Sequence, residues 1–96
     1  MNPAKIKELA DILERADNRE DLETLLGGLL TPREVDEFVK RWHLMVLLAR
    51  GETHRDIAGE LSISLGKIAR GSRLLKYGPD TFRAFIEREI ERDGGS

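Results

Sequence analysis

The segment from Thr31 to Arg50 constrains the fold of this 96-residue chain more than any other. It opens on the sequence TPRE, in which Thr31 can cap a helix, proline suits the first helical position and Glu34 completes a capping box. Gly51 follows and is expected to end the helix. Because the helix between them is apolar around most of its circumference, it must be covered on several sides. In so short a chain, a second subunit is the expected cover.

Apolar residues recur at helical spacing along the rest of the chain, and no stretch alternates for long enough to predict a strand. The spacing predicts an all-α fold of six helices in one domain over residues 1–96. The first helix is expected to end near Ala16, and the second to cover 19–26 and stop at the glycine pair Gly27-Gly28. The remaining helices are expected over about 31–50, 54–61, 65–75 and 79–92.

Composition excludes several classes of function. The chain has no cysteine, and neither histidine lies near a cluster of acidic residues with metal-ligand spacing, so no metal site is expected. No nucleophile with a nearby base and no paired carboxylates in an apolar setting can be assembled, so the chain is expected to be neither an enzyme nor a cofactor-binding protein. No apolar run is long enough for a membrane span or a signal peptide, which predicts a cytoplasmic protein that does not bind membranes.

The formal net charge of −2 conceals an uneven distribution. The segments 1–40, 41–77 and 78–96 carry −4, +4 and −2 respectively. A basic centre suits a localised surface that binds nucleic acid, although an ordinary solvated face would have the same charge.

Residues 53–76 have the layout of a helix-turn-helix motif, in which the second helix enters the major groove of DNA. Small and apolar residues occupy the positions where two such helices must pack: Ile57, Ala58, Leu61, Ile63 and Ile68. Any helical hairpin can have this pattern. A helical protein–protein interaction module, whose basic face binds an acidic partner, therefore stays open as an alternative.

The stretch LLTPREVDEFVKRWHLMVLLARGETHRDIAGELSISLGKIARGSRLLK resembles the tryptophan repressor family, most specifically at LLTP, RGE and RGS. The resemblance extends over about residues 20–90. It implies an intertwined homodimer, with a dimer core formed by helices over about 3–50 and 79–92. It also implies a repressor of tryptophan biosynthesis or transport genes that binds double-stranded operator DNA when a corepressor, most simply L-tryptophan, is bound.

The same resemblance implies a ligand site in which Arg41 and Arg70 lie on the two sides of an indole ring, with Gly71 allowing the ring to approach the backbone. Guanidinium groups both stack on aromatic faces and bind carboxylates. Leu74 and Gly28 depart from the usual family residues, so a related indole acid, or no ligand at all, is an alternative to tryptophan. The implied ligand residues are Gly28, Leu30, Thr31, Arg41, Leu44, Arg70, Gly71 and Leu74.

Two of these residues also have plainer explanations, since Thr31 is explained by capping and an isolated Arg41 would be a solvated side chain. For DNA, Arg55 is expected at a guanine edge. The predicted groove contacts are Ser64, Leu65, Gly66 and Lys67, and the predicted phosphate contacts are Ser72, Arg73 and Lys76.

Overall fold

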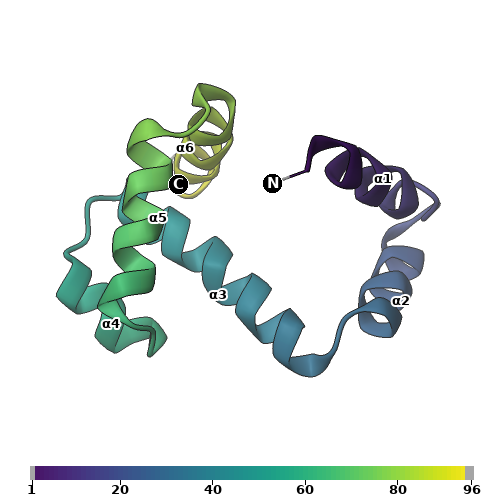
Figure 1. Cartoon of the computed structure of the whole chain (residues 1–96), viewed down its shortest axis with the longest axis horizontal. Coiled ribbons are helices and arrows are strands. Elements are labelled where there is room, and N and C mark those ends of the chain that lie inside the picture. The colour runs from purple at the N-terminus through teal and green to yellow at the C-terminus, as the bar shows by residue number, and fades with distance from the viewer. Residues whose placement is uncertain (1, 95–96) are drawn as a thin grey trace. The chain divides into compact units, whose positions relative to one another are not determined.

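The computed structural model describes residues 2–94, which form helices and no strand (Figure 1). The chain divides into two compact units between Glu37 and Phe38, a point that lies within the third helix. The helices are α1 (Pro3–Leu13), α2 (Arg19–Leu29), α3 (Pro32–Ala49), α4 (His54–Leu61), α5 (Leu65–Tyr77) and α6 (Asp80–Gly94).

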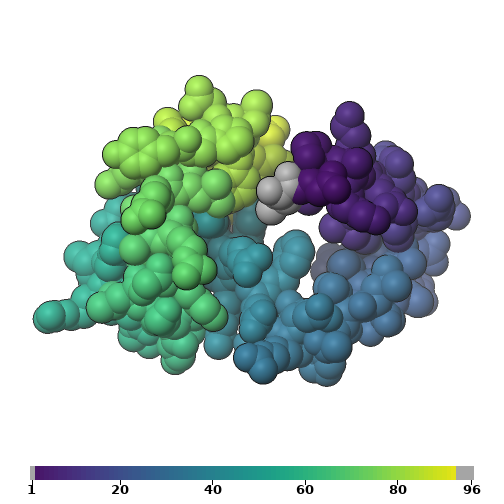
Figure 2. Space-filling model, viewed as in Figure 1, coloured from purple at the N-terminus to yellow at the C-terminus, as the bar shows by residue number. Residues whose placement is uncertain are grey.

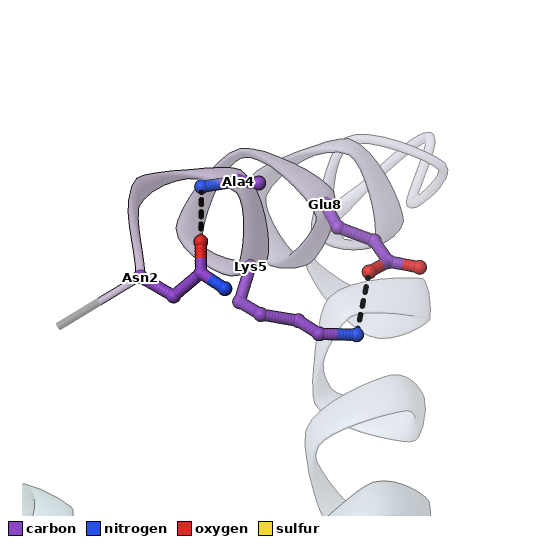
Figure 3. Close-up of polar contacts among 4 residues, drawn as sticks. All are labelled: Asn2, Ala4, Lys5 and Glu8. Atoms are coloured by element: carbon purple, nitrogen blue, oxygen red, sulfur yellow. Dashed lines mark hydrogen bonds and ion pairs between the residues drawn. The ribbon is translucent and has the colours of Figure 1, made fainter.

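The first unit contains α1, α2 and the first turns of α3, and each helix start has a side-chain cap. The Asn2 side chain accepts a hydrogen bond of 2.9 Å from the backbone N–H of Ala4, next to an exposed ion pair between Lys5 and Glu8 (Figure 3). Asn18 caps α2 by accepting from the N–H of Asp21 at 2.8 Å. These caps satisfy backbone donors that have no partner within the helix.

Two predicted helix ends in this unit are wrong. The second helix does not stop at Gly27-Gly28 but continues through both glycines to Leu29. Neither glycine has a positive φ angle, so neither takes the left-handed conformation that ends helices. The first helix ends at Leu13 rather than near Ala16, because the backbone tightens into a turn in which the N–H of Arg15 bonds to the carbonyl of Ile12.

The start and end of α3 agree with the sequence. The backbone N–H of Thr31 donates to the Glu34 carboxylate at 2.8 Å, and the N–H of Glu34 donates to the Thr31 hydroxyl at 3.1 Å, which completes the predicted capping box. Gly51 has a φ of 87° and ends the helix. The apolar character of α3 is only partly used in the single chain, since Phe38 is 67% exposed.

The second unit has a hydrophobic core formed by two clusters of buried residues. In one, Leu44 of α3 packs with Ile57 of α4 and Ile68 of α5. In the other, Met45 and Val46 of α3 pack with Ile86 of α6. Helix α5 contacts both α4 and α6 (Figure 1). The last helix begins at Asp80, close to the predicted start, and its Phe85 meets Trp42 edge to face with ring centroids 6.3 Å apart.

Candidate nucleic-acid interface and ligand pocket

Helices α4 and α5 form a helix-turn-helix whose two helices have capped N-termini. The Thr53 hydroxyl accepts from the N–H of Asp56 at 3.1 Å, and the Ser64 hydroxyl accepts from the N–H of Lys67 at 3.2 Å. The turn places Ser62 in the left-handed region, with φ 55° and ψ 47°. All five residues that the sequence placed between the two helices belong to the Leu44 cluster, which confirms that part of the prediction.

The residues predicted to contact DNA are mostly exposed, and the chain has no acidic residue from Leu65 to Tyr77. Leu65 is 59% exposed in the first turn of α5, and Gly66 has open space on its side-chain side except for the Ser64 hydroxyl. Figure 2 shows the atoms of the α5 region, in green, on the face toward the viewer. Ser72 alone among the predicted contacts is half-buried; the exposed ones are Arg55, Ser64, Leu65, Gly66, Lys67, Arg73 and Lys76.

Ser64 has a structural role beside the predicted one. Its oxygen accepts the Lys67 N–H as the cap of α5, which uses one of its acceptor positions. A hydroxyl also carries a proton that it can donate. Ser64 could therefore cap α5 and donate to a phosphate oxygen at the same time.

Five of the predicted ligand residues lie in the second unit. Arg41 and Arg70 are exposed, Leu44 and Gly71 are buried, and Leu74 is 44% exposed. A groove of about 460 Å³ in this unit lies elsewhere, on α3, α4 and α6, and none of these residues lines it. The single chain therefore has the two arginines on its surface rather than in an enclosed pocket.

Gly71 has a structural reason that the sequence did not reveal. A Cβ atom at this position would lie 3.0 Å from Leu44 Cδ2 and 3.3 Å from Leu48 Cδ1. The absence of a side chain therefore lets α5 pack closely against α3. This contact alone explains why a glycine occurs inside the helix despite its cost to helix stability. The approach of a ligand ring to Gly71 stays a prediction.

The other three predicted ligand residues belong to the first unit. Gly28 lies inside α2, and a Cβ there would meet no atom within 4 Å. Leu30 is half-buried and follows the end of α2, its N–H bonded to the carbonyl of Leu26. Thr31 is engaged in the capping box. The backbone N–H of Thr31, and secondarily its hydroxyl, lower the pKa of Glu34 below its ordinary value.

Arg83 is a residue that sequence reasoning missed. Its Nε donates to the carbonyl of Leu75 at 2.9 Å and its Nη2 donates to the carbonyl of Lys76 at 2.7 Å, so α6 holds the C-terminal end of α5. The only available signal was Pro79, which has no N–H and so cannot bond the carbonyl four residues before it.

Comparison with known proteins adds the family. The sequence profile of the Trp repressor protein matches residues 4–90. The chain belongs to the Trp repressor family. This is a family of DNA-binding regulators with a helix-turn-helix and not of enzymes. The predicted all-α fold and the resemblance are both confirmed.

Three relatives illustrate the degree of similarity, each named "Trp operon repressor homolog". The chain is 34% identical to the one from Chlamydia trachomatis serovar L2 over 70 residues, which is 72% of this chain and 74% of the relative. It is 31% identical to the one from Vibrio atlanticus over 81 residues, 83% of each chain. It is 28% identical to the one from Xylella fastidiosa over 83 residues, 85% of this chain and 88% of the relative.

Among residues 2–94, no three histidine or acidic side chains that the structure describes are grouped so that they could hold a metal ion. No helix in the same range is both long and apolar enough to cross a lipid bilayer.

Proposed function

We propose that this Trp repressor family member is a homodimeric transcriptional repressor that binds operator DNA through α4 and α5 when an indole corepressor is bound. The observation that carries the proposal is the packed helix-turn-helix, in which Ile57 and Ile68 are fully buried and the outer face of α5 is basic. A capped helix with a free N-terminal turn and several cations is suited to lie against a phosphate backbone.

The favoured corepressor is L-tryptophan. Arg41 and Arg70 supply two exposed guanidinium groups, which can stack on an indole ring and bind a carboxylate. Gly71, the residue after Arg70 on α5, packs closely on Leu44, so apolar atoms lie next to this turn of the helix. The names of the relatives refer to the Trp operon, which supports tryptophan genes as the target.

A different indole acid is the second candidate, and a specific observation favours it. Leu74 lies one helical turn after Arg70 and presents an apolar, 44% exposed side chain. A leucine there offers no hydrogen bond to the ammonium group that distinguishes tryptophan from indole acids. The family assignment weighs against the third reading, a protein–protein interaction module.

The dimer is proposed from the exposed apolar surface. Phe38 is 67% exposed on α3, and Val39 next to it and Ile6 and Leu9 on α1 are also open to solvent. Large apolar side chains clustered on helix faces indicate an interface rather than a solvated surface. A second copy of the chain would cover them and would bring its own Thr31 region to the complex.

Calorimetric titration with L-tryptophan, indole-3-acetate and indole-3-propionate tests the ligand. Calorimetry is preferable to intrinsic fluorescence because Trp42 would contribute to the signal. One tryptophan bound per subunit supports tryptophan as corepressor. Binding of an indole acid without tryptophan moves the assignment to that acid, and absence of binding by all three refutes the ligand-dependent function.

A pair of variants separates the ligand site from the DNA surface. Arg70→Ala should weaken corepressor binding at least about tenfold, as loss of a hydrogen bond to a charged group implies, while the dimer persists. Lys67→Ala should leave corepressor binding unchanged. It should weaken binding to a duplex selected from a random library and lower the salt dependence of that binding by about one ion. An unchanged corepressor affinity in Arg70→Ala would place the ligand site elsewhere. An unchanged DNA affinity in Lys67→Ala would place the DNA surface elsewhere.

A further inference from the structure

The C-terminal end of α5 has a defect that the sequence imposes. In a continuing helix, the carbonyl of Leu75 would accept from the N–H of residue 79, but Pro79 has none. The chain then turns into α6, so the carbonyl of Lys76 also lacks its helical donor. Only the preceding carbonyl, that of Leu74, is satisfied by the backbone, through the N–H of Gly78 at 2.8 Å.

Arg83 replaces both missing donors with one side chain. Its Nε bonds the carbonyl of Leu75 and its Nη2 bonds that of Lys76, at 2.9 and 2.7 Å. The positive guanidinium also lies at the negative end of the α5 dipole. Asp80, one turn earlier on α6, approaches Arg83 to 3.8 Å as an exposed ion pair, which is expected to contribute little.

The Arg83 contact joins α6 to α5 beside the end of α3. Its side chain lines a shallow groove together with Leu48 and Ala49 at the end of α3, and with Leu75 and Lys76 at the end of α5. The predicted phosphate contacts Ser72, Arg73 and Lys76 lie in the same last turns of α5. Arg83 therefore attaches to α6 the same end of α5 that is predicted to contact the DNA backbone.

We infer that Arg83 is a positioning residue for ligand-controlled DNA binding, which rests on the function proposed above. With its C-terminal end held by Arg83, α5 is expected to respond to a ligand at Arg70 by moving its N-terminal end, which carries Leu65 and Lys67, together with α4, on which Ile68 packs. Without that attachment, both ends of α5 move, and ligand binding is coupled less strongly to the DNA-competent orientation. Arg83 thus sets the coupling between the two sites without contacting either ligand.

The test compares Arg83→Met, which keeps the length but removes donors and charge, with Arg83→Lys, which keeps the charge and one point donor. Arg92→Met is the matched control. It removes the same charge from the same helix, where the arginine forms an exposed ion pair with Glu89 at 3.7 Å. Binding to a duplex selected with the wild-type protein is measured without ligand and with saturating L-tryptophan, or with the indole acid that calorimetry identifies. Circular dichroism fixes a temperature at which every variant is folded.

The expected result is that Arg83→Met lowers the ligand-induced gain in DNA affinity about tenfold, equivalent to one charge-assisted hydrogen bond. Arg83→Lys should recover part of the gain, and Arg92→Met should lose none. Ligand affinity in the absence of DNA should change little in all three.

Three results would overturn the inference. A ligand-induced gain that is unchanged in Arg83→Met would give Arg83 a purely structural role. A drop of about one in the salt dependence would make Arg83 itself a phosphate contact. An equal loss of the ligand-induced gain in DNA affinity in Arg92→Met would show that the effect comes from the change in net charge. If the wild-type protein shows no ligand-dependent DNA binding, the proposed function fails first, and the inference fails with it.

Discussion

The two units of the chain differ in how they are stabilised. Residues 38–92 include fully buried side chains at Ile57, Ile68 and Ile86, whereas no side chain among residues 2–37 is buried. Helices α1 and α2 have 11 residues each, a length at which an isolated helix is marginal in water. The second unit therefore has a core of its own, whereas the first unit has capped helices and exposed apolar surface that the proposed partner subunit would cover.

The largest expected contrast comes from truncating one apolar residue in each unit. Ile68→Ala should lower the free energy of unfolding by about 2–5 kcal/mol, because it leaves a cavity in the Leu44 cluster. Leu9→Ala should cost about 1 kcal/mol or less in dilute protein, because Leu9 is 48% exposed. Urea unfolding measured over a range of protein concentrations checks both. Under the dimer proposal, only the Leu9→Ala deficit grows with concentration. Equal losses in the free energy of unfolding for Ile68→Ala and Leu9→Ala at the lowest protein concentration would contradict the difference between the two units.

A pair of glycine substitutions sharpens the comparison. Gly71→Ala should lower the free energy of unfolding by about 1 kcal/mol, because Leu44 is held by Ile57 and Ile68 and cannot easily move from the new Cβ. Gly28→Ala should raise it by about 0.5–1 kcal/mol, because the Cβ meets nothing and alanine favours the helix. Thermal unfolding measures both. Stabilisation by both substitutions would show that α5 does not pack on α3 as closely as described.

The smallest effect concerns the capping box of α3. Because the folded-state pKa of Glu34 is lowered from its ordinary value of 4.5, its contribution is present above about pH 4.5 and is lost as pH falls through the lowered pKa. Glu34→Gln should therefore flatten the fall in stability below pH 4.5. Thr31→Ala should flatten it less, since the backbone N–H of Thr31, the larger cause, remains. Urea unfolding between pH 3 and pH 6 measures the slope, and an unchanged slope in Glu34→Gln would contradict the assignment.

Local signals in the sequence predicted most of the helix boundaries. Thr31, Thr53 and Ser64 each cap the helix that follows, and Gly51 ends α3, because capping depends on residues within four positions of one another. The same kind of reasoning was wrong at Gly27-Gly28, since a glycine pair permits a helix end but does not require one. The predicted packing of α4 on α5 was confirmed because its spacing is also short.

Contacts between distant parts of the chain could not be predicted. Nothing in the sequence near Gly71 indicates that it packs against Leu44 and Leu48, which precede it by 23 or more positions. The two bonds from Arg83 to the end of α5 depend on the direction that α6 takes after Pro79. The exposed and basic character of α5 was predictable, but the ligand and DNA contacts assigned from the family resemblance stay predictions.

The left-handed backbone at Ser62 has a consequence for how α4 and α5 behave together. A residue with a Cβ pays about 1–2 kcal/mol to adopt this conformation, so the turn alone does not favour the angle between α4 and α5. That angle is imposed by the side chains that meet beneath it. When the contact between Ile57 and Ile68 opens, nothing offsets the cost of the left-handed turn. The amide protons of α4 and α5 should therefore lose their protection from hydrogen exchange together, as one cooperative segment. The shape of the proposed DNA-binding surface is thus set by side chains in the interior of the protein.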